Sequence, residues 1–353
     1  PEQHVGDLLD ATAARFKSLD ESEFRADLEK LSSRAVSKTG DPLIRITSVP
    51  SAPGINYSPN EKVTAPVVQQ FSGLIENNWR TTSFSALSQG AFSGEEPDFD
   101  AEEIPVRDNT VSTGIFAFPS GIRPGICIHQ IFERLNFNDD SKIDDLVREK
   151  LSENGFDLDH LPVVAQMVRN VIATRLPCGH DLRSIKHQDR LNELEFSFPL
   201  NEITSGAIHG LFTRHNIISP SAEAPAQIGR LTFSPVQGFM RGFIDQVFRV
   251  DGKFYIVDWK SSWLGNRPED YDATAMWNEM FARFYHLQYH IYTIALNRYL
   301  QNRLADYKYE EHFGGVIYAF VRGIDPARPD LGIFHDRPSP QLISDLDELL
   351  VIR

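Results

Sequence analysis

The chain has 353 residues, a hydrophobic content of 41% and a formal net charge of −14 at pH 7. This length and composition allow at least one substantial core, in one large domain or two smaller ones. The acidic balance argues against a simple nucleic-acid-binding module, because such modules normally have a basic face. No secretory signal and no run of about 18 apolar residues is visible, so the sequence predicts no membrane span.

The two cysteines, Cys127 and Cys178, fit no C-x-x-C spacing. They predict a reduced, cytoplasmic protein with neither zinc nor an iron–sulfur cluster. The negative charge is densest in the segment EEPDFDAEE at residues 95–103, which we interpret as a solvated acidic loop. Since the remainder is not basic either, we expect weak DNA affinity and a shallow salt dependence for the isolated chain.

The chain begins with helical spacing over residues 1–35, followed by a Pro-, Ser-, Gly- and Asn-rich linker at 39–62. A helix is predicted from about 64 to 88, with Ser83 or Ser85 near the start of another short one. The core elements expected after the acidic loop are a helix at 124–136, a helical insertion at 142–174, a strand at 192–199, a hairpin at 238–260, helices within 269–304 and a strand at 313–321. Without its insertion this order is αβββαβ, which predicts an α/β fold with a mixed central sheet flanked by helices.

The hairpin holds the most informative residues. Asp251-Gly252 between alternating apolar residues predicts a two-residue turn that pairs Val250 with Lys253. The same register places Asp245 opposite Asp258, with Cβ atoms roughly 5 Å apart, where like charges destabilise a sheet. The two carboxylates therefore require a positive group between them.

A divalent cation with oxygen ligands is the simplest candidate for that group, and Lys260 lies on the same strand face as Asp258. There the lysine can stabilise negative charge that develops on a substrate, which points to metal-assisted hydrolysis. A purely structural alternative is a salt bridge between Lys260 and one aspartate, which leaves the second aspartate unpaired.

The pattern of an aspartate, twelve residues and then D-W-K is also the two-acid-and-lysine signature of the PD-(D/E)xK nuclease superfamily. Its surroundings are more specific, because GFMRGFIDQVFRVDGKFYIVDWKSSWLG, LQYHIYTIALNRYLQNRLADYKYEEHFGGVIYAFVRGID, FPSGIRPGICIHQIFE and LNELEFSFPL all closely resemble one family. That family is the C-terminal nuclease domain of RecB, a subunit of the RecBCD helicase-nuclease (exodeoxyribonuclease V). The resemblance covers about residues 112–325, with NWRTTSFSALS at 78–88 similar to its lead-in.

The resemblance implies a role for each matching residue. Asp245, Asp258 and His129 would bind the metal, together with the backbone carbonyl of Trp259, and Lys260 would be the catalytic lysine. Gln288 and Tyr292 match the Q-x-x-x-Y element of this branch, and their spacing puts both on one helix face. The ELEF segment supplies a further acid, Glu193 or Glu195; the sequence cannot choose between them, and we favour Glu195 beside Phe196.

The implied cofactor is Mg²⁺, which suits oxygen ligands; the imidazole would also admit Mn²⁺, and Ca²⁺ could bind without supporting catalysis. The implied partners are single-stranded DNA, RecC- and RecD-like subunits and the RecA recombinase. The implied domains are a helicase tail and linker at 1–62, lead-in helices and the acidic loop at 63–105, and the nuclease domain at 106–353.

The sequence therefore predicts a metal-dependent deoxyribonuclease that cuts single-stranded DNA during the repair of broken ends. The chain has no initial Met and no G-x-x-x-x-G-K-[ST] loop, so we expect a piece of a longer protein whose ATPase lies elsewhere. Two alternatives stay open: a catalytically silent module of this fold that holds DNA or a partner, and a metal-dependent hydrolase with a different substrate.

Overall fold

The computed structural model describes residues 14–37, 40, 42–47, 79–88, 113–217 and 231–352. The acidic segment 95–103, most of the predicted linker and the start of the predicted helix at 64–88 lie outside these ranges. Among the described residues, no helix is both long and apolar enough to cross a membrane.

The chain divides into two compact units, Pro1–Gly73 and Leu74–Arg353. The described part of the first unit is dominated by helix α2 (Glu21–Arg34), which begins with a capping box. Asp20 Oδ1 accepts a hydrogen bond from Glu23 N at 2.8 Å, and the Glu23 carboxylate accepts one from Asp20 N at 3.2 Å. This satisfies two backbone donors at the helix start and confirms helix within 1–35. The domain boundaries at residues 62 and 105 stay a prediction.

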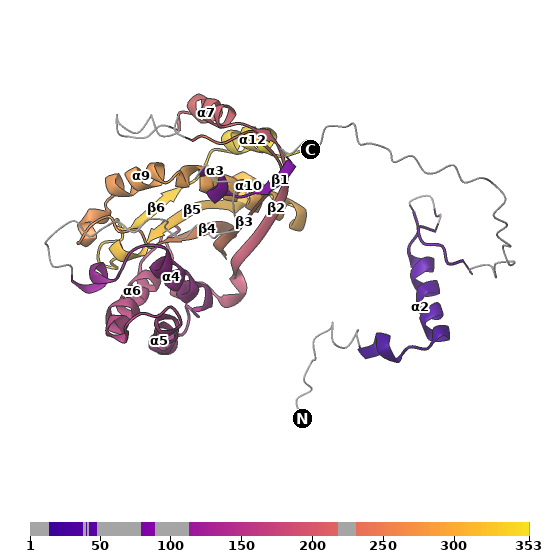
Figure 1. Cartoon of the computed structure of the whole chain (residues 1–353), viewed down its shortest axis with the longest axis horizontal. Helices are drawn as coiled ribbons and strands as arrows, with labels where there is room; N and C mark the ends of the chain where they lie inside the picture. Colours follow the sequence, from indigo (N-terminus) through magenta and orange to yellow (C-terminus); the bar gives the residue numbers. More distant parts are fainter. Residues whose placement is uncertain are drawn as a thin grey trace, which may run out of the picture. The chain divides into compact units, whose positions relative to one another are not determined.

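The second unit is a mixed sheet between two layers of helices (Figure 1). Its strands are β1 (Trp79–Thr82), β2 (Arg190–Ile203), β3 (Val236–Val250), β4 (Lys253–Lys260), β5 (Phe313–Phe320) and β6 (Ile333–Asp336). Its helices are α3 (Phe84–Ser88), α4 (Ile122–Arg134), α5 (Ile143–Glu153), α6 (Leu161–Ala173), α7 (Ser205–Arg214), α9 (Ala273–Ala282), α10 (Tyr285–Arg303), α11 (Tyr309–His312) and α12 (Pro340–Leu350), with short 3₁₀ turns between them.

The predicted αβββαβ order is confirmed by α4, β2, β3, β4, the pair α9 and α10, and β5. Strands β2, β3 and β4 are antiparallel neighbours, whereas β4 and β5 are parallel, so the sheet is mixed. A parallel pair needs a long crossover between its strands, and α9 and α10 supply it. The helical insertion at 142–174 is confirmed as α5 and α6.

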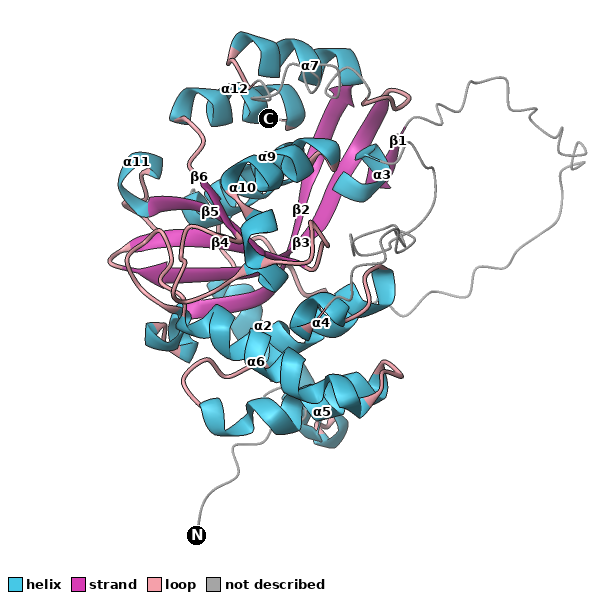
Figure 2. Cartoon of the chain, turned by 90° about the vertical axis from the view of Figure 1, so that its left-hand side faces the viewer, coloured by secondary structure: helices cyan, strands magenta, loops and turns pink. Residues whose placement is uncertain are grey.

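Strand β3 organises the sheet because it has β2 along one side and two different strands along the other. On that second side, β4 pairs with residues 246–250 and β1 pairs with residues 237–240. Between these two ladders, residues 241–245 have no paired strand on that side among the described residues. The sheet therefore splits at this point, and β2, β3 and β1 extend beyond β4 toward α7 and α12 (Figure 2).

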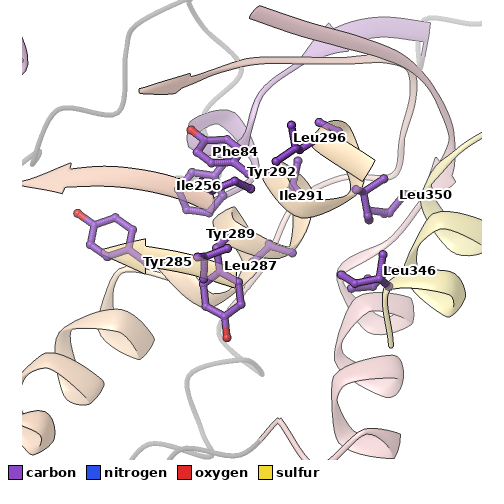
Figure 3. Packing of buried hydrophobic residues seen from close by; sticks show 14 of the residues in the cluster. Phe84, Ile256, Tyr285, Leu287, Tyr289, Ile291, Tyr292, Leu296, Leu346 and Leu350 are labelled. Atoms are coloured by element: carbon purple, nitrogen blue, oxygen red, sulfur yellow. The ribbon is translucent and has the colours of Figure 1, made fainter. Parts of the chain in front are cut away.

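Each face of the sheet covers its own hydrophobic core. Cys127, Ile128 and Phe132 of α4 pack with α5, α6 and one face of β4 and β5. Helices α7, α9, α10 and α12 cover the other face, where Tyr292 of α10 lies close to Phe84 and Ile256 (Figure 3). Helix α10 is buried over most of its length because it has the sheet on one side and α12 on the other.

Some predicted elements were wrong or missed. Residues 79–82 form strand β1 and not part of a helix, since this short segment pairs with β3. The short helix near Ser83 is confirmed as α3, where Ala86 N donates to Ser83 Oγ at 3.2 Å. The prediction did not include α7, β6 or α12.

Candidate active site

The hairpin of β3 and β4 has the predicted register. Its pairs run from Val250 with Lys253 to Gln246 with Val257, and the turn residues Asp251 and Gly252 both have positive φ, of 49° and 76°. Two successive residues with positive φ define the type I′ turn that asparagine or aspartate followed by glycine prefers. One step beyond the last pair lie Asp245 and Asp258, the two predicted acids.

At the point where β3 diverges from β4, the side chain of Asp245 replaces the backbone carbonyl that would otherwise accept a hydrogen bond from β4. Its Oδ2 accepts a hydrogen bond from the Trp259 N–H at 2.8 Å. The same oxygen lies 3.3 Å from Nδ1 of His129, which α4 brings to the sheet. The side chains of His129 and Asp245 are 10% and 13% exposed, so the pair is largely desolvated but open at one end.

Asp258 and Lys260 form a buried ion pair in which Oδ1 and Nζ lie 2.8 Å apart and both side chains are 2% exposed. Beyond this ion pair, Oδ1 of Asp258 has no hydrogen-bond partner among the described residues. The pKa of Asp258 is raised to about 7, chiefly by burial and also by the charge of Asp245, against the lowering effects of Lys260 and His129. The two acids are therefore close enough to oppose each other's ionisation.

Aromatic rings surround the ammonium group of Lys260. Its Nζ lies 3.8 Å from the ring centre of Tyr285 and 5.4 Å from that of Tyr318. Ring faces attract a cation, so these contacts hold the charged end of the lysine in place. Neither tyrosine was predicted from the sequence as a site residue, although Tyr318 interrupts an otherwise apolar strand.

Gln288 and Tyr292 lie on one face of α10, as their spacing predicted. Gln288 Nε2 donates to the Tyr292 hydroxyl at 3.2 Å, and the Tyr318 hydroxyl donates to Gln288 Oε1 at 2.7 Å. Tyr292 also packs edge-on against Phe196 of β2, with 5.7 Å between ring centres. A continuous set of contacts thus runs from Lys260 through Tyr318 to the Q-x-x-x-Y pair.

Of the two candidate glutamates, Glu193 and not Glu195 lies beside the aspartates. The pairs on either side of Glu193, Asn192 with Gln246 and Leu194 with Ile244, place it opposite Asp245. Its φ of 49° is unusual for a strand residue, although the pairing with β3 continues in the same register on both sides of it. Desolvation first, and then the charges of Asp245, Glu133 and Asp258, raise the pKa of Glu193 to about 8, even though the residue remains open to solvent.

Glu195 instead forms an exposed ion pair with Arg241, at 2.9 Å. Our preference for Glu195 rested on its position beside Phe196, whereas the pairing of β2 with β3 brings Glu193 to Asp245 and pairs Glu195 with Phe243. Glu133 was missed as well, although it follows His129 by four residues in α4 and so shares its helix face.

Neighbouring elements hold the end of β4 in place. The indole of Trp259 stacks on Phe132 of α4, with 4.3 Å between ring centres. Buried Arg322, which follows β5, donates from Nε to the Ser261 carbonyl at 2.7 Å and from a terminal nitrogen to the Phe118 carbonyl at 2.7 Å. Trp259 and Ser261, which flank Lys260 in the sequence, are therefore each held in place by a neighbouring element. The predicted ligand role of the Trp259 carbonyl stays a prediction.

His129, Asp245, Asp258 and Lys260, here called the acid–lysine cluster, lie at the point where the sheet splits. Within the part of the chain that the structure describes, no group of three or more His, Cys, Asp and Glu side chains already forms a metal site. Each acid of the cluster instead has a basic neighbour, His129 for Asp245 and Lys260 for Asp258. The donor set nonetheless suits a hard cation, since it combines two carboxylates with one imidazole.

Comparison with known proteins gives the family. No family model matches the chain. The RecBCD enzyme subunit RecB of Escherichia coli (strain K12) is 36% identical over 303 residues, which cover 84% of this chain and 25% of that protein. RecB of Haemophilus influenzae is 32% identical over 301 residues, covering 79% and 24%. RecB of Mycolicibacterium smegmatis is 29% identical over 370 residues, covering 92% and 33%.

The fold and the cluster define a mixed α/β domain compatible with a PD-(D/E)xK nuclease-like core. The chain belongs to the RecB family, as a RecB-derived domain. It spans about a quarter to a third of the length of these relatives.

The position of Glu193 leads to a first prediction. Glu193→Gln is expected to lower DNA cleavage by at least about tenfold, because it removes a carboxylate opposite Asp245. Glu195→Gln is the matched control on the same strand and should keep cleavage within about twofold, since an exposed ion pair contributes little. The cleavage rate of each variant is measured on a labelled oligonucleotide. A larger loss of cleavage in Glu195→Gln than in Glu193→Gln would show that Glu195 is the acid of the site.

Proposed function

We propose that the chain is a Mg²⁺-dependent deoxyribonuclease domain of a RecB-like subunit, which hydrolyses phosphodiester bonds of single-stranded DNA during double-strand-break repair and recombination. The observation that supports it best is the meeting of Asp245, Asp258, His129 and Lys260 at one point of a RecB-like sheet. Each of these residues was predicted from the sequence, and they come from α4, β3 and β4.

Asp245, Asp258 and His129 would hold the ion, with Glu193 beside them and the Trp259 carbonyl as a further ligand. Bound there, Mg²⁺ would stabilise negative charge on the scissile phosphate and lower the pKa of a water. The pKa values of Asp258 and Glu193 are raised first by desolvation and then by neighbouring acids, and a bound cation would favour the ionised form of both groups. A nitrogen ligand also admits Mn²⁺, and Ca²⁺ would occupy the site without supporting cleavage.

The remaining residues would position the substrate. Lys260 offers a buried ammonium held by Asp258 and the ring of Tyr285, so it can stabilise charge that develops on the phosphate oxygens. His129 holds the carboxylate of Asp245 in one orientation. Gln288 and Tyr292 are buried and bonded to each other, and Gln288 accepts a hydrogen bond from Tyr318, so they would act by supporting the wall of the site behind Lys260.

A catalytically silent module that holds DNA or a partner is the second candidate. One observation favours it: each acid of the cluster already has a basic neighbour, so the fold can accommodate the charges by itself. The relatives are subunits of the RecBCD enzyme, which supports assembly of this chain with RecC- and RecD-like subunits. Contact with RecA and a cytoplasmic location belong to the same proposal and derive from the resemblance and the cysteine pattern.

A cleavage assay with defined ions separates these candidates and gives a second prediction. The chain should cut end-labelled single-stranded DNA in Mg²⁺ or Mn²⁺, lose this activity in EDTA, and be inhibited competitively by Ca²⁺. Asp258→Ala and Lys260→Ala should each be inactive. Calorimetric Ca²⁺ binding that is lost in Asp258→Ala would report the site independently of activity. DNA binding without any cleavage would favour the silent module, and Ca²⁺ binding without DNA cleavage or DNA binding would favour another substrate.

A further inference from the structure

One face of the β2–β3–β1 extension carries exposed aromatic rings. Trp79 of β1 and Phe239 and Phe243 of β3 are 56%, 38% and 44% exposed. Among the described residues of the second unit, these three are the aromatic side chains that remain more than about a third exposed. Large apolar rings gathered on one exposed face mark a binding surface, because a fold without one would bury them.

The strand geometry places the three rings on a single face, here called the aromatic face. Phe239 and Phe243 are four residues apart in β3, so they point to the same side with Cα atoms about 13 Å apart. Trp79 meets Phe239 edge-on, with 5.4 Å between ring centres. The opposite side of β3 carries Met240 and Ile244, which are fully buried in the core under α10.

The aromatic face lies next to the acid–lysine cluster along β3. Phe243 precedes Asp245 by two residues, so their Cα atoms are about 7 Å apart along the strand. In β2, Glu195 pairs with Phe243, and Glu193 lies opposite Asp245. The extension that carries the rings and the split that holds the acids are thus parts of one continuous pair of strands (Figure 2).

The charge of this face determines which contacts it can offer to DNA. Arg241 lies between the two phenylalanines, with its guanidinium 5.9 Å from the Phe243 ring centre, but Glu195 accepts a hydrogen bond from it. The whole chain has a net charge of −14. Phosphate contacts are therefore a weak source of affinity here, whereas stacking of bases on aromatic rings does not depend on net charge.

We infer that the aromatic face is a stacking platform for single-stranded DNA, on which bases pack against Phe243, Phe239 and Trp79 and lead the strand to the acid–lysine cluster. This inference rests on the proposed function for the identity of the ligand. It adds an element outside the cluster that holds the substrate without taking part in the chemistry. Bases of any sequence can stack, so the platform binds without base preference.

Binding measurements in EDTA test the platform without cleavage. Anisotropy of a labelled oligo(dT) should show about 5- to 30-fold weaker binding for Phe243→Ala and for Trp79→Ala, the range expected when a stacked base loses its ring. Phe243→Tyr should bind like the parent, whereas Phe243→Leu should be as weak as Phe243→Ala. Leu304→Ala, at an exposed leucine just beyond α10, is the matched control and should leave binding unchanged.

Two further readouts distinguish stacking from other contacts. An oligonucleotide with abasic sites should bind the parent and Phe243→Ala equally. Oligo(dT) should quench the tryptophan fluorescence of the parent much more than that of Trp79→Phe, because Trp79 is exposed whereas Trp259 is buried and Trp263 and Trp277 are half-buried. Stability measured for each variant by urea unfolding should match the parent, since these rings lie outside the core.

The outcomes separate this inference from the proposed function. Weaker binding of the ring variants without any cleavage by the parent would keep the platform and remove the nuclease assignment. Cleavage by the parent with unchanged DNA binding in Phe243→Ala and Trp79→Ala would overturn the platform. Retained binding by Phe243→Leu would overturn it as well, since an apolar surface for a protein partner tolerates leucine and a stacking surface does not.

Discussion

Lys260→Met is expected to lower DNA cleavage by at least about 100-fold, the usual effect of removing one group that stabilises developing charge. Methionine keeps the apolar length of the side chain against Tyr285 and Tyr318, so the variant isolates the loss of the ammonium group. Single-turnover cleavage at saturating Mg²⁺ measures the effect. Cleavage at the parent rate would show that Lys260 is only a structural counter-ion.

The same substitution should change the pH dependence of stability. Without its partner, buried Asp258 would have a pKa above the parent value of about 7, whereas the unfolded chain has the ordinary value of 3.8. The folded state then binds more protons than the unfolded state, so the free energy of unfolding falls as pH rises from about 4 through 7 and beyond. Urea unfolding at pH 5.5 and 8 should show the loss mainly at pH 8.

The matched control is Lys308→Met. Lys308 pairs with Glu311 at 2.7 Å, but both side chains are more than half exposed. Solvent screens such an exposed pair, so it contributes little, and stability and its pH dependence should stay close to the parent. Equal losses in Lys260→Met and Lys308→Met would mean that burial of the Asp258–Lys260 pair has no energetic consequence.

Asp245→Asn is expected to reduce divalent-ion affinity by at least about tenfold and cleavage by at least about 100-fold. The fold should remain intact because the asparagine carbonyl can still accept the hydrogen bond from Trp259 N–H. Calorimetry with Mn²⁺ or Ca²⁺ reports affinity, and the DNA assay reports cleavage. This variant thus separates the charge of Asp245 from its structural hydrogen bond.

Asp189→Asn is the control for Asp245→Asn. Asp189 also lies beside the sheet and accepts a hydrogen bond from Arg249 at 3.0 Å, but away from the cluster. Its replacement should leave ion affinity and cleavage unchanged. If Asp245→Asn binds ions and cleaves as well as Asp189→Asn, Asp245 is not a ligand, and the contact between Asp245 and His129 would have only a structural role.

The proximity of Asp245 and Asp258 was predictable from the sequence because a two-residue turn fixes the register of a hairpin. Asp251-Gly252 set the pairing of β3 with β4, and that pairing placed Asp245 beside Asp258. The i, i+4 spacing likewise placed Gln288 and Tyr292 on one helix face. Local geometry determines such relations, so no knowledge of the rest of the fold was needed.

The choice between Glu193 and Glu195 could not be predicted, since it depends on the register in which β2 pairs with the distant strand β3. Strand β1 was missed for a related reason: four residues, Trp79–Thr82, become a strand only because β3 offers a free edge after leaving β4. The rings of Tyr285 and Tyr318 around Lys260 come from different elements, and nothing in their sequence positions indicates that they meet.

The sequence by itself determined the αβββαβ order and the hairpin register that brings Asp245 to Asp258. Both follow from turn chemistry and periodicity within short segments, whereas the roles of the acids, the histidine and the lysine are predictions that derive in part from the family resemblance. Only the tertiary structure decided that the sheet splits at Asp245, that Glu193 lies opposite it, and that Phe239, Phe243 and Trp79 share an exposed face. Those features depend on which strand occupies each edge of β3, and pairing between distant segments decides that.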